Sequence, residues 1–141
     1  MSYVVDASVV VKLFIVEDYS DKATEIINAH AKGYISLSAP TLIVYELGNV
    51  FWKHPHITYE KAYRFIEKFL DLDINLVDVH SNVELLKTAC RISESMSLTF
   101  YDASYIAIAE RDKVKLITAD EELHNKAQDF TLLLKDVKGI K

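Results

Sequence analysis

The stretch Tyr3-Val4-Val5-Asp6-Ala7-Ser8-Val9-Val10-Val11 decides the expected fold class. Tyr3 to Val5 is a run of aromatic and β-branched residues that predicts a short strand ending at Asp6. Ser8 then predicts the N-cap of an apolar helix that continues to about Val16. Open α/β sheets bind their ligands at the carboxyl ends of strands, which is the place that Asp6 occupies. This segment therefore indicates an α/β fold with a site beside Asp6.

The alternation of strands and helices continues to the end of the chain. Gly33 predicts the C-cap of one helix, Pro40 the first turn of the next, and Thr58 the N-cap of a third. Ser81 and Thr99 fit the first residues of two further helices, with Ser81 opening a capping box. Expected strands span residues 3–5, 34–38, 74–79, 115–118 and 131–134, and expected helices span 8–16, 20–32, 42–52, 58–70, 81–95, 99–111 and a short segment from 120. The repeated β and α units predict an α/β/α sandwich with a central parallel sheet.

The composition indicates one compact domain over residues 1–141. Half of the chain is hydrophobic (50%), and only 3 Gly and 2 Pro are available for flexible linkers. A chain of this length buries one sizeable core and is too short for two. The longest apolar runs fall far short of a membrane span, and no basic stretch precedes the first of them. We therefore expect a cytoplasmic protein.

Cysteine content and charge exclude several classes of site. The single cysteine, Cys90, excludes an internal disulfide and a thiolate-only metal cage, and we expect it to be buried as a small hydrophobe. The net charge of −5 argues against a broad cationic surface for nucleic acid. Any binding of nucleic acid must then be local or assisted by metal ions.

Four carboxylates lie in stretches that otherwise look buried. Asp6 and Asp120 each follow a predicted strand, and Asp102 begins an apolar helix. Glu46 lies in the middle of a helix that is apolar nearly all round, with Asn49 as its only polar neighbour on the same face. Burial of one such carboxylate without a partner would be costly. Mg²⁺ and Mn²⁺ bind carboxylate oxygens, so the four acids together predict a divalent metal site.

A second interpretation of these acids needs no metal. Asp102 and Asp120 would start helices, Asp6 would close a turn, and Glu46 would pair with a buried Lys or Arg. Lys12 is the only basic residue inside the apolar runs, which weakens this interpretation for the four acids together.

Two hydroxyl residues, Ser8 and Thr118, stand close to the acids in the sequence. They either hydrogen-bond the metal ligands and their waters or serve only in capping and turn formation. The histidines do not compete for the metal, because none shows the spacing of zinc ligands; they are His30, His54, His56, His80 and His124.

Four short motifs contain the acids. They are Val4-Val5-Asp6-Ala7-Ser8, Tyr45-Glu46-Leu47-Gly48-Asn49, Phe100-Tyr101-Asp102-Ala103 and Leu116-Ile117-Thr118-Ala119-Asp120. Each motif is short, but in this order and at these separations they resemble the PIN-domain nuclease family over nearly the whole chain. The resemblance implies that the catalytic, metal-binding quartet is Asp6, Glu46, Asp102 and Asp120. It also implies that Ser8 and Thr118 lie beside the quartet.

The resemblance carries further expectations about fold and activity. The family's parallel sheet has the strand order 3-2-1-4-5, which would bring Asp6 and Asp120 side by side. The compact single domain is most similar to VapC-type toxins of prokaryotic toxin–antitoxin pairs. Such a protein would be an endoribonuclease in which water activated by Mg²⁺ or Mn²⁺ attacks an RNA phosphodiester. A small VapB-like antitoxin would keep it silent by placing its tail in the acidic groove.

Such proteins also commonly dimerise. The third and fourth expected helices carry an unusual set of aromatic residues, which predicts a homodimer through those helices, unless the rings fill the monomer's core. These residues are Tyr45, Phe51, Trp52, Tyr59, Tyr63 and Phe69. Five basic residues are candidates for contacts with RNA phosphates, or serve only solubility: Lys12, Lys53, Lys61, Arg64 and Arg111.

Three other classes of protein place acids in similar positions. A phosphatase of the haloacid-dehalogenase type would need a second acid where Ser8 stands. A receiver domain would need an acid pair near Asp6 and a late lysine at a strand end, and neither is evident. A PIN-like domain that binds RNA or a protein without cutting remains an alternative, although the intact quartet disfavours it.

Overall fold

The computed structural model, which describes residues 1–140, contains a five-stranded parallel sheet with the strand order β3-β2-β1-β4-β5. The strands are β1 (Ser2–Val5), β2 (Ser36–Pro40), β3 (Asn75–Val77), β4 (Lys115–Thr118) and β5 (Thr131–Leu133). In the centre of the sheet, Val5 of β1 lies opposite Ile117 of β4. The predicted fold class, an α/β/α sandwich around a parallel sheet in the order 3-2-1-4-5, is confirmed.

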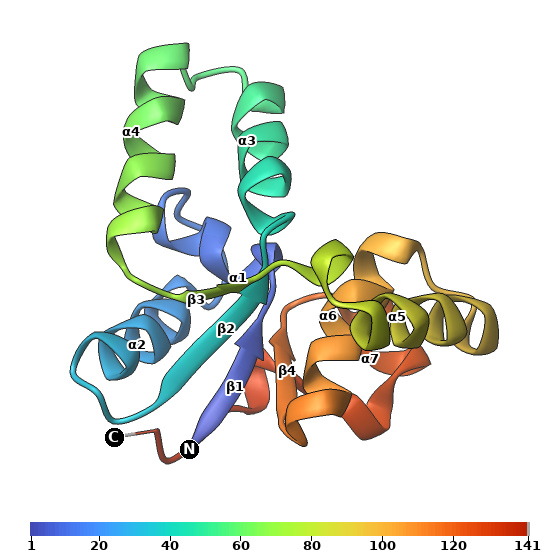
Figure 1. Cartoon of the computed structure of the whole chain (residues 1–141). Helices are drawn as coiled ribbons and strands as arrows, with labels where there is room; N and C mark the ends of the chain where they lie inside the picture. Colours follow the sequence, from blue (N-terminus) through green and yellow to red (C-terminus); the bar gives the residue numbers. More distant parts are fainter. Residues whose placement is uncertain (141) are drawn as a thin grey trace.

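Helices cover both faces of this sheet (Figure 1). The α-helices are α1 (Ala7–Val10), α2 (Ser20–Ala31), α3 (Ile43–Lys53), α4 (Tyr59–Asp71), α5 (Val83–Met96), α6 (Phe100–Asp112) and α7 (Glu121–Lys126). Short 3-10 turns are η1 (Val11–Leu13), η2 (Val79–Ser81), η3 (Gln128–Phe130) and η4 (Leu134–Asp136). In Figure 1, α2 lies on one side of the sheet and α5, α6 and α7 on the other, while α3 and α4 project past the carboxyl ends of the strands.

The core forms where α6 crosses the middle of the sheet. Every residue from Ala103 to Ala109 is buried, so this part of α6 is enclosed on all sides, and the helix packs against β1, β2 and β4. The central strands begin with an exposed residue and are buried toward their carboxyl ends, as expected for a parallel sheet covered on both faces. A smaller aromatic cluster joins α3 and α4 to the body, with the Phe51 ring 5.7 Å from Phe14 and 5.3 Å from Phe65. No helix in residues 1–140 is long and apolar enough to cross a membrane.

The first helix begins before Ser8, so the predicted N-cap is wrong. Asp6 is the N-cap of α1, and its carboxylate accepts a hydrogen bond from the backbone N of Ser8 at 2.9 Å. Asp and Ser are equally good N-caps, so local sequence does not choose between neighbouring candidates. The helical turns also end at Leu13 rather than near Val16. The Ser8 hydroxyl is consequently available for bonds outside the helix.

Two further boundaries differ from the predicted ones. Pro40 ends β2 instead of opening a helix, and the missing N–H costs no pairing with β1, whose register with β2 stops at Ser38. Asn82, not Ser81, caps α5, and its Oδ1 accepts a hydrogen bond from the backbone N of Leu85 at 3.0 Å. The predicted caps at Thr58 and Thr99 are confirmed. Lys32 rather than Gly33 is the C-cap of α2, and Gly33 follows it in the left-handed conformation.

The expected burial of Cys90 is also wrong, because the side chain is exposed on α5. Leu85, Ala89 and Ile92 form the buried face of this helix, and Cys90 directly follows one of them. Successive helical residues are about 100° apart around the axis, so Cys90 points away from that face.

Candidate active site

Asp6 lies at the carboxyl end of β1, where its backbone N donates to the carbonyl O of Ile117 on β4 at 3.3 Å. Only 7% of the residue is exposed. Its carboxylate accepts hydrogen bonds from the Ser8 backbone N at 2.9 Å, from the Ser8 hydroxyl, and from the Thr118 hydroxyl at 2.5 Å. Burial raises the pKa of Asp6 to about 6, although the hydrogen bonds from Ser8 and Thr118 oppose the rise. The site therefore holds an acid whose charge is costly until a cation approaches.

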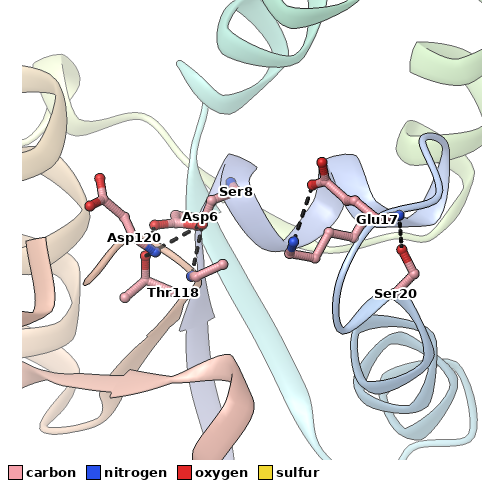
Figure 2. Close-up of polar contacts among 8 residues, drawn as sticks. Asp6, Ser8, Glu17, Ser20, Thr118 and Asp120 are labelled. Carbon is pink, nitrogen blue, oxygen red and sulfur yellow. Dashed lines mark hydrogen bonds and ion pairs between the residues drawn. The ribbon is translucent and has the colours of Figure 1, made fainter. Parts of the chain in front are cut away.

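Ser8 and Thr118 connect Asp6 to the end of β4 (Figure 2). The Ser8 hydroxyl accepts a hydrogen bond from the Ala119 backbone N at 2.9 Å. The Thr118 hydroxyl accepts one from the Asp120 backbone N at 3.0 Å while donating to Asp6. Each hydroxyl thus donates one hydrogen bond and accepts one, which fixes its orientation. The hydroxyls hold the first and fourth strand ends in register, so Asp6 and Asp120 lie in one network.

Glu46 is oriented by a residue that the sequence did not single out. The phenol of Tyr105, only 1% exposed, donates to Glu46 Oε1 at 2.6 Å from the middle of α6. Burial raises the pKa of Glu46, the hydrogen bond from Tyr105 lowers it, and the nearby charge of Asp102 raises it again. The pKa of Tyr105 is raised by its own burial and by Glu46, so the phenol stays protonated and remains a donor.

Asp102 and Asp120 lie at the start of two different helices. The Asp102 backbone N donates to the Thr99 hydroxyl at 3.1 Å in the first turn of α6. Burial, and next the charge of Asp120, raise the pKa of Asp102. Asp120 is the N-cap of α7 and accepts a hydrogen bond from the Leu123 backbone N at 3.1 Å. Asp102 and Asp120 therefore do lie at helix starts, as the interpretation without metal expects. This position leaves both carboxylates compatible with a role in metal binding as well.

Lys126 is the second residue that sequence reasoning missed. It lines a hollow of 240 Å³ together with Asp102 and Asp120, and its positive charge lowers the pKa of Asp102. Its ammonium donates to the carbonyl O of Ser97 at 3.3 Å and lies 3.8 Å from Glu122. Nothing in the local sequence marks this lysine, because it reaches the acids only when α7 lies beside the start of α6.

The four acids come from four separate elements, and their negative charges interact. Glu46 raises the pKa of Asp6, Asp102 raises that of Glu46, and Asp120 raises that of Asp102. No ion pair within residues 1–140 includes any of the four, and Lys12 pairs with Glu17 at 3.1 Å instead. The interpretation of Glu46 as partner of a buried cation thus has no support in the described chain.

A divalent ion fits the chemistry of this donor set. Carboxylate oxygens are the preferred ligands of Mg²⁺ and Mn²⁺, and a cation would relieve the mutual repulsion of the acids. Within residues 1–140, no group of three or more His, Cys, Asp or Glu side chains is close enough together to hold a metal ion without movement of the side chains. Asn49 is exposed on α3, and no described hydrogen bond joins its side chain to the acids. Its place beside the site stays a prediction.

The sheet order and the acids at its carboxyl edge define a class of protein that comparison with known families identifies. The chain belongs to the PIN-domain family, which matches residues 3–129.

Individual relatives agree with this assignment. Ribonuclease VapC3 of Pyrobaculum aerophilum is 32% identical over 129 residues, which cover 89% of this chain and 95% of that protein. Exonuclease VapC9 of the same organism is 34% identical over 90 residues, or 62% of this chain and 64% of that protein. The crystal structure of PAE2754 from P. aerophilum superimposes with a TM-score of 0.70 at 28% identity, covering 96% of this chain and 85% of the other. A toxin–antitoxin complex from Klebsiella pneumoniae has a TM-score of 0.68 at 14% identity, covers 96% and 99% of the two chains, and supports the fold alone.

Proposed function

We propose that this chain is a metal-dependent endoribonuclease, the toxin of a VapBC-type toxin–antitoxin pair, with residues 1–141 acting as one PIN-like nuclease domain. The observation that carries the proposal is a set of four carboxylates from four elements. Burial and the charge of a neighbouring acid of the set raise the pKa of Asp6, Glu46 and Asp102, and no ion pair within residues 1–140 includes any of the four. The similarity to a protein named as a ribonuclease supports RNA as the substrate. The intact quartet favours cutting over silent binding.

Asp6, Glu46, Asp102 and Asp120 would hold the ion, Mg²⁺ or Mn²⁺. A bound ion of this kind lowers the pKa of water and offsets the charge that develops on a phosphodiester. The chain's own residues keep the acids oriented: Ser8 and Thr118 bond both oxygens of Asp6. Tyr105 donates to one oxygen of Glu46, Oε1, and Asn49 remains a polar neighbour of Glu46 on α3.

We assign the phosphate contact nearest to the acids to Lys126. It lies in the same hollow as Asp102 and Asp120 and bears the positive charge that an RNA phosphate would meet there. Of the candidates named from sequence, Lys12 pairs with Glu17 at 3.1 Å and Arg111 with Asp112 at 2.8 Å, which makes both less available. Lys53, Lys61 and Arg64 lie on α3 and α4 and would contact RNA farther from the acids.

Incubation of the purified protein with total RNA, including transfer RNA, tests the proposed activity. We expect discrete fragments with Mg²⁺ or Mn²⁺ and none with chelator, because the acids repel a phosphate unless a cation stands between them. Discrete fragments indicate internal cutting, whereas progressive shortening from one end would indicate an exonuclease. No cleavage by protein that binds RNA would favour the non-cutting alternative, and cleavage in chelator would contradict the metal dependence.

A small VapB-like antitoxin is the proposed protein partner. Structures with the same fold include the complex from Klebsiella pneumoniae and VapBC2 from Rickettsia felis bound to a DNA fragment from their promoter. An acidic groove that must be kept from RNA suits a partner whose tail carries basic residues. We also propose the cytoplasm, where RNA is available, as its location.

The aromatic residues of α3 and α4 divide into two groups. Phe51 and Phe69 are buried, as the core interpretation predicts. On α3, Tyr45 is 80% exposed and Trp52 77% exposed. On α4, the next helix in the sequence, Tyr59 and Tyr63 are also exposed. Tyr45 and Trp52 lie seven residues, about two helical turns, apart on one face of α3.

We propose that this exposed face joins two copies in a homodimer. Light scattering after size exclusion should give the mass of a dimer for the native protein and of a monomer for Trp52→Glu, because a charge in an apolar interface lacks a partner. Tyr34→Glu, which alters another exposed tyrosine, should remain dimeric. A native monomer at micromolar concentration would contradict the dimer.

A further inference from the structure

A second hollow lies beside Asp120. It has a volume of 400 Å³ and is lined by Tyr19, Ala119, Asp120, Glu121, Leu133, Leu134 and Lys135. Asp120 belongs to both hollows, so the second one continues directly from the proposed site of cleavage. Its volume lies in the range of about 300–1,000 Å³ that is usual for small-molecule sites.

Tyr19 occupies the rim of this hollow in an unusual backbone conformation. Its φ of 67° and ψ of 16° are left-handed, a region that a bulky residue rarely adopts and that glycine or asparagine adopts more readily. Folding alone does not explain a tyrosine here. Its side chain makes no capping hydrogen bond at the start of α2, and the residue is 52% exposed. A strained position that keeps an aromatic ring exposed indicates a use for the ring.

Hydrogen bonds fix the two chain segments next to Tyr19. Lys22, one turn into α2, donates to the carbonyl oxygens of Lys135 at 2.7 Å and Val137 at 2.8 Å. The loop before Tyr19 is held by the hydrogen bond from the Glu17 backbone N to the Ser20 hydroxyl at 3.0 Å (Figure 2). The hollow is therefore formed before any ligand arrives, which lowers the entropic cost of binding.

We propose that this hollow binds one unpaired base of the RNA, stacked on the ring of Tyr19, while the neighbouring phosphate lies at the four acids. The half-buried Ala119 and the edge of Leu133, which is 8% exposed, provide a small apolar surface beside the ring. Glu121 and Lys135, which pair with each other at 3.3 Å, provide polar groups for the edge of the base. A base held in a duplex cannot stack on a protein ring, so the base bound here must be unpaired. This inference rests on the proposed ribonuclease function.

Binding of a fluorescent single-stranded RNA decamer of mixed sequence tests the inference, with all proteins carrying Asp102→Asn so that the RNA stays whole. Tyr19→Gly should weaken the affinity by about 5- to 150-fold, the range for loss of one base–aromatic stack. The same change should leave the unfolding midpoint unchanged or higher, because glycine relieves the left-handed strain. Tyr19→Phe should bind within about 2-fold of the parent, since the ring is kept.

Two controls separate stacking from other effects. Tyr34→Ala removes an exposed tyrosine just before β2, at the amino ends of the strands and away from the acids. This variant should leave the affinity unchanged. Decamers with a single abasic site should bind more weakly to the parent at one position, and that penalty should vanish in Tyr19→Gly, as expected for two groups that contact each other.

Three results would overturn the inference. They are RNA binding that Tyr19→Gly leaves unchanged, an equal loss in Tyr19→Phe, and an abasic penalty that persists without Tyr19. If the native protein cuts RNA in any of these cases, the proposed ribonuclease function is kept and only the proposed base site is rejected. If native protein neither cuts nor binds RNA, the proposed function fails and the base site fails with it.

Discussion

Asp102→Asn should reduce metal-dependent cleavage of RNA by roughly 10²–10³-fold or more, because it removes one negative charge from the proposed metal ligands. The substitution keeps the shape of the side chain. It also keeps the helix start, since the bond to the Thr99 hydroxyl at 3.1 Å comes from the backbone N of residue 102. The loss should therefore appear in activity and in metal affinity, while the unfolding midpoint in chelator should stay the same or rise.

Asp112→Asn is the matched control for this experiment. Asp112 lies at the other end of the same helix, is partly exposed, and pairs with Arg111 at 2.8 Å. Surface pairs of this kind contribute little to stability, so this variant should cut RNA like the native protein. Cleavage rates on a defined RNA, taken across a titration of Mg²⁺ and of Mn²⁺, separate weaker metal binding from a slower reaction. Near-native cleavage by Asp102→Asn would show that Asp102 is not a metal ligand.

Asp6→Asn should make the protein more stable at pH 7.5 in chelator while abolishing cleavage. The carboxyl of Asp6 is buried, and its pKa rises from 3.8 to about 6 on folding. That difference corresponds to roughly 3 kcal/mol of lost stability once the group is charged in both states. Asparagine carries no charge and is as good an N-cap as aspartate, so its Oδ1 can keep the bonds from Ser8 and the start of α1. Its Nδ2 cannot accept the bond from the Thr118 hydroxyl, which must turn and accept instead, so the gain should be smaller than the full penalty.

The sign of the pH dependence follows from the same pKa. Below the unfolded value of 3.8 the acid is protonated in both states, and the native protein has no penalty. Between 3.8 and about 6 the unfolded chain releases its proton before the folded chain does, so stability falls as pH rises. Glu46 and Asp102, whose pKa values are also raised by burial, act in the same direction.

Urea unfolding at pH 5.0, 6.0 and 7.5, with chelator and with Mg²⁺, measures this effect. The native protein without metal should lose stability across the series, and Asp6→Asn should lose less. Mg²⁺ should stabilise the native protein at pH 7.5 more than it stabilises the variant, because ligand binding adds to the free energy of unfolding only where the site is intact. Asp18→Asn, an exposed aspartate near the same segment, should behave as native. A variant less stable than native protein at pH 7.5 in chelator would contradict the penalty assigned to Asp6.

Local sequence determined the order and kind of the main elements and the identity of the four acids. Strand β4 spans the predicted residues 115–118, and the caps at Thr58 and Thr99 are where the residue types indicate. These features depend on contacts between residues a few positions apart and on the period of apolar residues, which the sequence displays directly. The acids could be recognised because burial of a carboxylate without a partner costs free energy, so an acid in an apolar run indicates a bound cation or another special role.

Where two good caps are neighbours, local sequence could not choose between them. Asp6 in place of Ser8, and Asn82 in place of Ser81, are decided by how the helix docks on the sheet. The exposure of Cys90 has the same origin, because the face that α5 buries is set by its packing against α6. The differences in capping and helix propensity between neighbouring residues are small compared with the free energy of burying one helix face.

Only the tertiary structure decided how distant residues serve the acids. Tyr105 reaches Glu46 across 59 positions of sequence, and Thr118 reaches Asp6 across 112. Lys126 and Tyr19 border Asp120 from elements whose mutual placement depends on the whole core. A hydrogen bond or a hollow of this kind depends on side-chain positions to within an ångström, and those positions come from close packing rather than from the order of residues along the chain.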